Sequence, residues 1–174
     1  MKKYISCTVL LCFVVLAGCN NNAPTSANVE KVVKRDGQPD IDYVASEDKA
    51  MNAAIQKARA TFGTFIVAFS KRKANQNSFA IKQKFTDANG SEHMWIGSLK
   101  FDGKSFRGRL NNEPYEVKTV KLGDNISVDS KELSDWMYIE NGKLVGGYTI
   151  RVLTNKMSPQ ERQQFEKESG FKLK

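Results

Sequence analysis

His93 is the only histidine of the chain, and an imidazole is the side chain best suited to moving protons near neutral pH. Glu92 precedes it directly, and with Asp135 it could form a general acid–base pair of the kind a hydrolase uses. The period-two pattern places His93 on the same strand face as Trp95 and Leu99. A half-buried histidine bonded to the backbone fits that pattern equally, and we favour this structural interpretation over catalysis.

A second group combines aromatic rings, amides and a carboxylate, a mixture that suits the recognition of sugars or peptides. Its members are Trp95, Asn111, Asn112, Asp135, Trp136 and Tyr138. As a ligand-binding site they would line one groove. An Asp before a strand also caps turns, and a Trp after it commonly packs in the core. The structural interpretation is again favoured.

A third group is basic and lies at alternating positions of neighbouring predicted strands. It comprises Lys82, Lys84, Lys100, Lys104, Arg107 and Arg109. If one face of the sheet gathers them, an anionic surface could dock there through many weak contacts. Outward strand positions are ordinarily polar and solvated, so the pattern by itself does not establish such a site.

Metal, cofactor and nucleophile motifs are absent from the sequence. The three cysteines are Cys7, Cys12 and Cys19, and none is left as a free thiol if the amino-terminal segment is processed as described below. A single imidazole without thiols does not make a common zinc site, and we expect no metal and no cofactor. The chain also lacks a GxSxG or SxxK context and a phosphate-binding glycine loop.

The amino terminus has the three parts of a secretory signal. Lys2 and Lys3 precede an apolar run over residues 4–17, and the small residues of Leu16-Ala17-Gly18 lead directly into Cys19. This resembles a bacterial lipoprotein signal, in which residues 1–18 are removed and Cys19 carries the lipid. The run is too short for a transmembrane helix, which needs about 20 residues. A plain secretory signal with a chance cysteine is the alternative.

Residues 19–44 are expected to be the lipidated cysteine and a flexible tether, because they are polar and contain Pro24, Gly37 and Pro39. Asn20 follows the anchor, where an inner-membrane protein of enteric bacteria usually has Asp. We therefore expect attachment to the outer membrane, facing the periplasm. Removal of residues 1–18 leaves 25 basic against 19 acidic residues, a formal charge of about +6. That charge suits a protein or anionic envelope partner, whereas the compartment excludes nucleic acid.

Residues 45–174 are expected to form one α+β domain. An apolar stripe that includes Met51, Ala58 and Phe65 predicts a helix from Ser46 to about residue 71, which Gly63 would kink or split. Ser158, Pro159 and Glu161 form a capping-box pattern that predicts a C-terminal helix to about Ser169.

Between these helices the apolar period changes to two. Residues 79–85, 95–101 and 106–110 predict three antiparallel strands in a meander, joined by turns at 87–90 and 102–103. Further short strands are expected at 115–117 and 126–128, one helical turn at 130–134, and a last hairpin of 136–139 with 143–153, which bends at Gly146-Gly147. The fold class is thus an N-terminal helix packed on a strongly curved antiparallel sheet or small open barrel of about six strands, plus a C-terminal helix.

Several segments occur in an order that resembles the YegJ-like family, a bacterial domain of unknown function found on small exported proteins. They are Met51-Asn52-Ala53-Ala54-Ile55 with Lys57-Ala58-Arg59, Glu92-His93-Met94-Trp95-Ile96, Gly108-Arg109-Leu110-Asn111-Asn112-Glu113-Pro114, Gly123-Asp124, Asp135-Trp136-Met137-Tyr138 and Gly142-Lys143-Leu144-Val145-Gly146-Gly147-Tyr148-Thr149. The resemblance covers roughly residues 45–153. It implies no activity, cofactor or catalytic residue.

The sequence as a whole predicts a lipid-anchored, periplasm-facing envelope protein that is a non-catalytic binding or accessory module. Two alternatives stay open. One is an inhibitor or immunity-type protein that masks a protein partner, and a large exposed charged or apolar patch would favour it. The other is an envelope hydrolase that uses His93 and Asp135, which would have to meet in a cleft.

Overall fold

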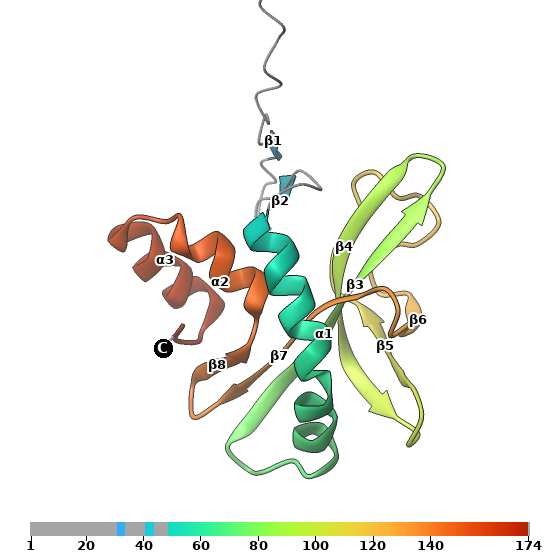
Figure 1. Ribbon diagram of the computed structural model, residues 1–174, viewed down its shortest axis with the longest axis horizontal. Coiled ribbons are helices and arrows are strands. Elements are labelled where there is room, and N and C mark those ends of the chain that lie inside the picture. Colours follow the sequence, from blue (N-terminus) through green and yellow to red (C-terminus); the bar gives the residue numbers. More distant parts are fainter. Residues whose placement is uncertain (1–30, 34–40, 44–48, 174) are drawn as a thin grey trace, which may run out of the picture.

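The computed structural model describes residues 31–33, 41–43 and 49–173 (Figure 1). The expected signal peptide, Cys19, much of the expected tether and the expected helix start at Ser46 lie outside the described residues. Within the tether range, the short strands β1 (Lys31–Val33) and β2 (Ile41–Tyr43) pair antiparallel. Among the helices of the described segments, none combines the length and the apolar character needed to cross a membrane.

The first helix, α1 (Lys49–Ser70), is continuous over 22 residues, so Gly63 does not split it. Gly63 lies on the exposed side of the helix, and a Cβ built there would meet nothing within 4 Å. The opposite side packs well: Phe65 is fully buried, and Phe62 stacks on it with ring centroids 5.6 Å apart. A glycine inside a helix costs only about 1 kcal/mol, which this packing outweighs.

We therefore expect the Gly63→Ala variant to be more stable than the natural chain by about 0.5–1 kcal/mol. Alanine fits the helical backbone, meets open space and restricts the unfolded chain. Urea unfolding followed by circular dichroism measures the change. A loss of stability would show that the helix needs the freedom of glycine at this position.

The main sheet has six antiparallel strands in the order β6-β5-β4-β3-β7-β8, and it is open because β6 and β8 do not pair. Its strands are β3 (Gln76–Asp87), β4 (Gly90–Phe101), β5 (Phe106–Leu110), β6 (Asn125–Ser127), β7 (Leu133–Glu140) and β8 (Lys143–Gly146). The α+β class, the six-stranded sheet and the β3–β4–β5 meander are confirmed.

The last hairpin is shorter than predicted, and a helix that was not predicted follows it. β8 ends at Gly146, and α2 (Tyr148–Asn155) begins where a long strand was expected. Gly146 and Gly147 have φ of 72° and 58°, a left-handed conformation that turns the chain out of the sheet. A Cβ at Gly146 would collide with the carbonyl oxygen of Trp136, so only glycine fits this close approach.

The C-terminal helix α3 (Pro159–Ser169) begins with the predicted capping box, and Gly170 ends it in the left-handed conformation. Two smaller predictions are wrong. Residues 115–117 form a loop, and residues 130–132 form turns that lead directly into β7.

The two faces of the sheet are covered differently. α1 packs on the core face, where Phe65 contacts Phe79, Phe106 and Trp136. At the β7–β8 end, the opposite face carries a second apolar cluster that includes Ile139 and Leu144 of the sheet, Phe171 and Leu173. Figure 1 shows α2 and α3 on one side of α1 and the β3–β4–β5 meander on the other.

The rest of that opposite face, over β3, β4 and β5, is exposed to solvent. On β5, Phe106, Gly108 and Leu110 are buried, whereas Arg107 and Arg109 between them are exposed. We call this exposed side of β3–β5 the outer face.

Candidate functional site

Asp135 lies on β7 opposite Lys82 of β3, and its side chain is fully buried. Oδ1 accepts the N–H groups of Trp136 at 2.8 Å and Tyr148 at 3.1 Å. Oδ2 accepts both the N–H and the hydroxyl of Thr149, at 2.8 and 2.7 Å. Since Gly147 offers no side chain at the N-cap of α2, Asp135 caps this helix from the neighbouring strand.

Asp135 and Lys82 interact electrostatically across β7 and β3. Burial raises the pKa of the Asp135 carboxyl, and the hydrogen bonds and Lys82 oppose that rise. Burial also lowers the pKa of the Lys82 ammonium, which Asp135 partly offsets. On its other side Lys82 faces β4, and its Nζ lies 5.5 Å from the centroid of the Trp95 ring. Lys82 therefore links Asp135 to Trp95 across three strands.

His93 lies on β4 opposite Lys84, and the residue as a whole is exposed. Partial desolvation of the ring, then the positive charges of Lys82, Lys84 and Arg59, lower the pKa of His93 to about 4. Every charged group acting on the imidazole is thus a cation. A neutral histidine among cations has no carboxylate to orient it as a general base.

The predicted pair of His93 and Asp135 is not formed. β3 separates their strands, and the four hydrogen bonds that Asp135 accepts come from Trp136 and the start of α2. Glu92 is buried on the core face, where it accepts the N–H groups of Tyr115 and Val117 at 2.9–3.1 Å. Both carboxylates therefore accept hydrogen bonds from backbone N–H groups and are not available to the His93 imidazole.

Trp95, Asn111 and Asn112 do meet, as the sequence suggested. The Asn112 Oδ1 accepts the Trp95 N–H at 2.7 Å, and the Asn111 N–H donates to the Trp95 carbonyl at 2.8 Å. The Asn111 amide lies so close to Gly97 that a Cβ there would collide with it. These contacts fasten the segment after β5 to β4.

Trp136 and Tyr138 lie on the core face, so the predicted groove is divided between two sides of the sheet. Their exposed fractions are 2% and 6%. The Trp136 indole donates to the Ala58 carbonyl at 2.9 Å, and Tyr138 stacks on Phe79 at 4.8 Å between ring centroids. Both residues are part of the core.

The basic group is gathered on the outer face. Lys84 pairs with His93, Lys100 with Arg107, and Gly97 with Arg109; residues paired across antiparallel strands share a face. Lys82 is half-buried at the border with β7, and Lys104 lies in the hairpin turn away from the strands.

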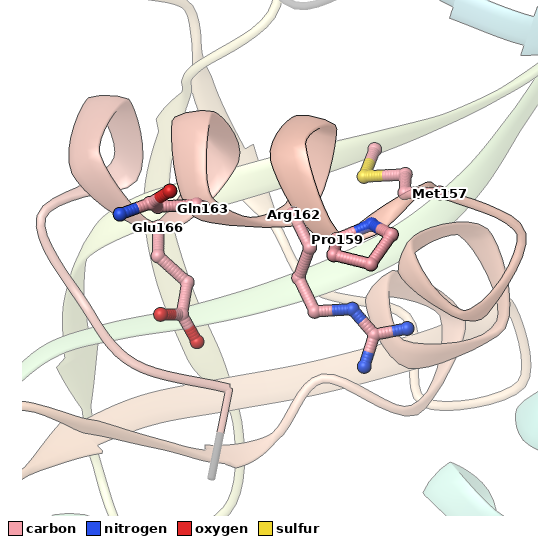
Figure 2. A pocket seen from close by; sticks show the side chains of 5 residues that line it. All are labelled: Met157, Pro159, Arg162, Gln163 and Glu166. Carbon is pink, nitrogen blue, oxygen red and sulfur yellow. The ribbon is translucent and has the colours of Figure 1, made fainter.

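Two open pockets lie away from the outer face. Figure 2 shows the first, of about 400 Å³, with side chains from α3 and from Met157 just before it. Its charged residues are engaged, since Arg162 donates to the Thr154 carbonyl and Glu166 accepts from Leu173 and Lys172. In the segments the structure describes, no three His, Cys, Asp or Glu side chains gather as a metal site would require.

The second pocket, of about 360 Å³, was not predicted from the sequence. It is lined by residues of α1, of the β4–β5 hairpin and of the segment 127–130. Among them are Phe62, Phe101 and Val128, and Lys104 also lines it. The apolar stripe of α1 predicted the helical wall of this pocket, and the alternating pattern of β4 predicted the strand wall. Nothing in the sequence indicated that the walls meet.

Comparison with known proteins places the chain in a family of bacterial proteins. The family model described as "Uncharacterized protein conserved in bacteria (DUF2314)" matches residues 48–173, and the chain belongs to that family. The chain is 35% identical over 107 residues to the uncharacterized protein YegJ of Escherichia coli K12, which covers 62% of this chain and 69% of that protein. The YegJ-like resemblance is confirmed.

A second relative is a putative ankyrin repeat protein of Neisseria meningitidis serogroup B. It is 35% identical over 143 residues, which are 78% of this chain and 56% of that protein. The chain thus spans little more than half of the neisserial relative. No solved structure matches the chain.

Proposed function

We propose that the chain is a lipid-anchored protein of the bacterial cell envelope that binds a partner without catalysing a reaction. The segment Leu16-Ala17-Gly18-Cys19 supports the anchor, which two or three acyl chains on Cys19 would make stable. Asn20 supports the outer membrane as its location, with the domain facing the periplasm.

The observation that most strongly supports a non-catalytic role is that the Asp135 carboxylate is engaged in structural hydrogen bonds. This carboxylate accepts four hydrogen bonds, all of them from Trp136 and from the first residues of α2. His93, its candidate partner, is surrounded by cations. Of the two residues best suited to acid–base chemistry, Asp135 therefore has a structural role and His93 lies at the surface without a carboxylate partner. We accordingly expect the protein to contact its partner through its exposed surface.

The test of the anchor replaces Cys19 with alanine in the full chain expressed in a bacterium. We expect loss of incorporated radiolabelled fatty acid and release from the membrane fraction. The Cys12→Ala variant is the matched control, because Cys12 lies in the segment expected to be removed, and it should stay acylated. Unchanged acylation of the Cys19→Ala variant would contradict the anchor.

The non-catalytic part is tested with the purified chain and envelope material. Peptidoglycan and phospholipid should be recovered intact after prolonged incubation. Soluble product that forms with the natural chain and disappears with His93→Gln would show the protein to be a hydrolase.

A further inference from the structure

The outer face is positively charged without compensation from its own strands. Five cations lie on it: Lys82, Lys84, Lys100, Arg107 and Arg109. The only carboxylates of β3–β5 are Asp87 and Glu92, which are on the other side and accept N–H groups of residues 115–119.

The exposed cations of this face also have few internal charge partners; among the described residues, Asp102 of the β4–β5 turn acts electrostatically on Arg107 without a salt bridge. Within the described segments, no carboxylate forms a salt bridge with Lys84, Lys100, Arg107 or Arg109. Side chains that stabilise the fold through charge would have such partners. These four instead extend into solvent on one side of the sheet, where they raise the local concentration of anions.

An indole lies among these cations. Trp95 is half-buried beside Lys82, and it projects from the same face as His93 and Lys84. A ring with an apolar body and a polar N–H is suited to the boundary between lipid and water. Basic side chains around such a ring match the composition of a membrane-surface contact.

We propose that the outer face docks on anionic phospholipid headgroups of the membrane that holds the anchor. This inference rests on the proposed function in one respect, the lipid on Cys19. Thirty residues separate Cys19 from Lys49, and a flexible chain of that length would span on the order of 30 Å, so an anchor on Cys19 would hold the domain close to the membrane surface. Tethering raises the effective concentration of the surface, so weak contacts suffice.

The shape of the site favours headgroups over a single enclosed ligand. Neither pocket is lined by any of the five cations, and the face is formed by outward side chains of three adjacent strands. Charges spread in this way contact many headgroups at once, and each Lys or Arg near an anionic membrane strengthens binding about fivefold.

The natural tryptophans provide the test. The full, lipidated chain is reconstituted into vesicles of phosphatidylcholine alone or mixed with phosphatidylglycerol, each with a nitroxide on some headgroups. A headgroup nitroxide quenches only an indole that it touches. Trp95 is partly exposed whereas Trp136 is only 2% exposed, so quenching reports Trp95, and the Trp95→Phe variant supplies the background.

We expect strong quenching in vesicles with phosphatidylglycerol, weak quenching in phosphatidylcholine, and loss of the difference at high salt. The combined variant Lys84→Gln, Arg107→Gln, Arg109→Gln should lower the docking equilibrium about 100-fold. Its matched control is Lys71→Gln, Lys73→Gln, Lys167→Gln, which removes the same charge from the ends of α1 and α3 and should behave like the natural chain. Equal quenching in both vesicle types, or in both triple variants, would overturn the docking proposal.

Sedimentation of the same vesicles separates this proposal from the anchor. Anchoring through Cys19 is independent of lipid charge and salt. If sedimentation requires Cys19 but quenching does not respond to phosphatidylglycerol, the anchor stands and docking is wrong. If instead the natural chain sediments only with anionic vesicles and is released by high salt, and the Lys84, Arg107 and Arg109 substitutions abolish this sedimentation, docking stands and the anchor is wrong.

Discussion

The Asp135→Ala variant is expected to lose about 3–5 kcal/mol of its free energy of unfolding. The substitution leaves the N–H groups of Trp136, Tyr148 and Thr149 without their acceptor in a fully buried site. It also removes the negative charge that stabilises the partly desolvated Lys82 ammonium. Urea unfolding measures the loss. Hydrogen exchange at Tyr148 and Thr149 should accelerate first, because they form the start of α2.

Two further variants identify the cause of this loss. Asp135→Asn keeps one acceptor oxygen and should lose about 2 kcal/mol. Asp129→Ala is the matched control, because Asp129 is exposed and its side chain accepts only the Lys131 N–H, so it should lose less than about 1 kcal/mol. If Asp135→Ala loses no more free energy of unfolding than Asp129→Ala, Asp135 is not a structural cap. A catalytic role for its carboxyl group would then be the better explanation.

The two tryptophans should respond in opposite ways to replacement by alanine. Trp136→Ala is expected to lose about 3–5 kcal/mol, because the ring is almost fully buried and its indole N–H bonds to the Ala58 carbonyl. Trp95→Ala should lose less than about 1.5 kcal/mol, since that side chain lies at the surface and is only partly buried. Thermal unfolding of both variants measures the difference. Equal losses would contradict the assignment of Trp136 to the core and Trp95 to the surface.

Local signals in the sequence predicted much of the fold. The Asp102-Gly103 turn and the alternating strands around it identified the meander, and Ser158 with Glu161 identified the start of α3. Such patterns depend on residues within a few positions of one another. The α2 helix escaped prediction because its N-cap is Gly147 and its cap comes from Asp135 on another strand.

The candidate site was less predictable, because the face on which a side chain lies depends on register. The sequence placed His93 and Leu99 on one face, but β4 contains a bulge between Gly97 and Lys100, with Ser98 at a φ of 48°. An extra residue in a strand reverses the alternation beyond it, so Leu99 is buried while His93 is exposed. The alternation of apolar and polar residues in the sequence did not predict this bulge.

The two edges of the main sheet bear on how the chain avoids associating with itself. An unpaired strand edge is a template on which another chain can add a strand. The β8 edge is covered by Lys172, where the Leu144 N–H donates to the Lys172 carbonyl and the Lys172 N–H donates to the Gly142 carbonyl, both at 2.8 Å. The opposite edge, β6, is only three residues long. Lys172 thus covers the β8 edge, so a truncation that removes residues 171–173 would uncover β8 and promote insoluble protein.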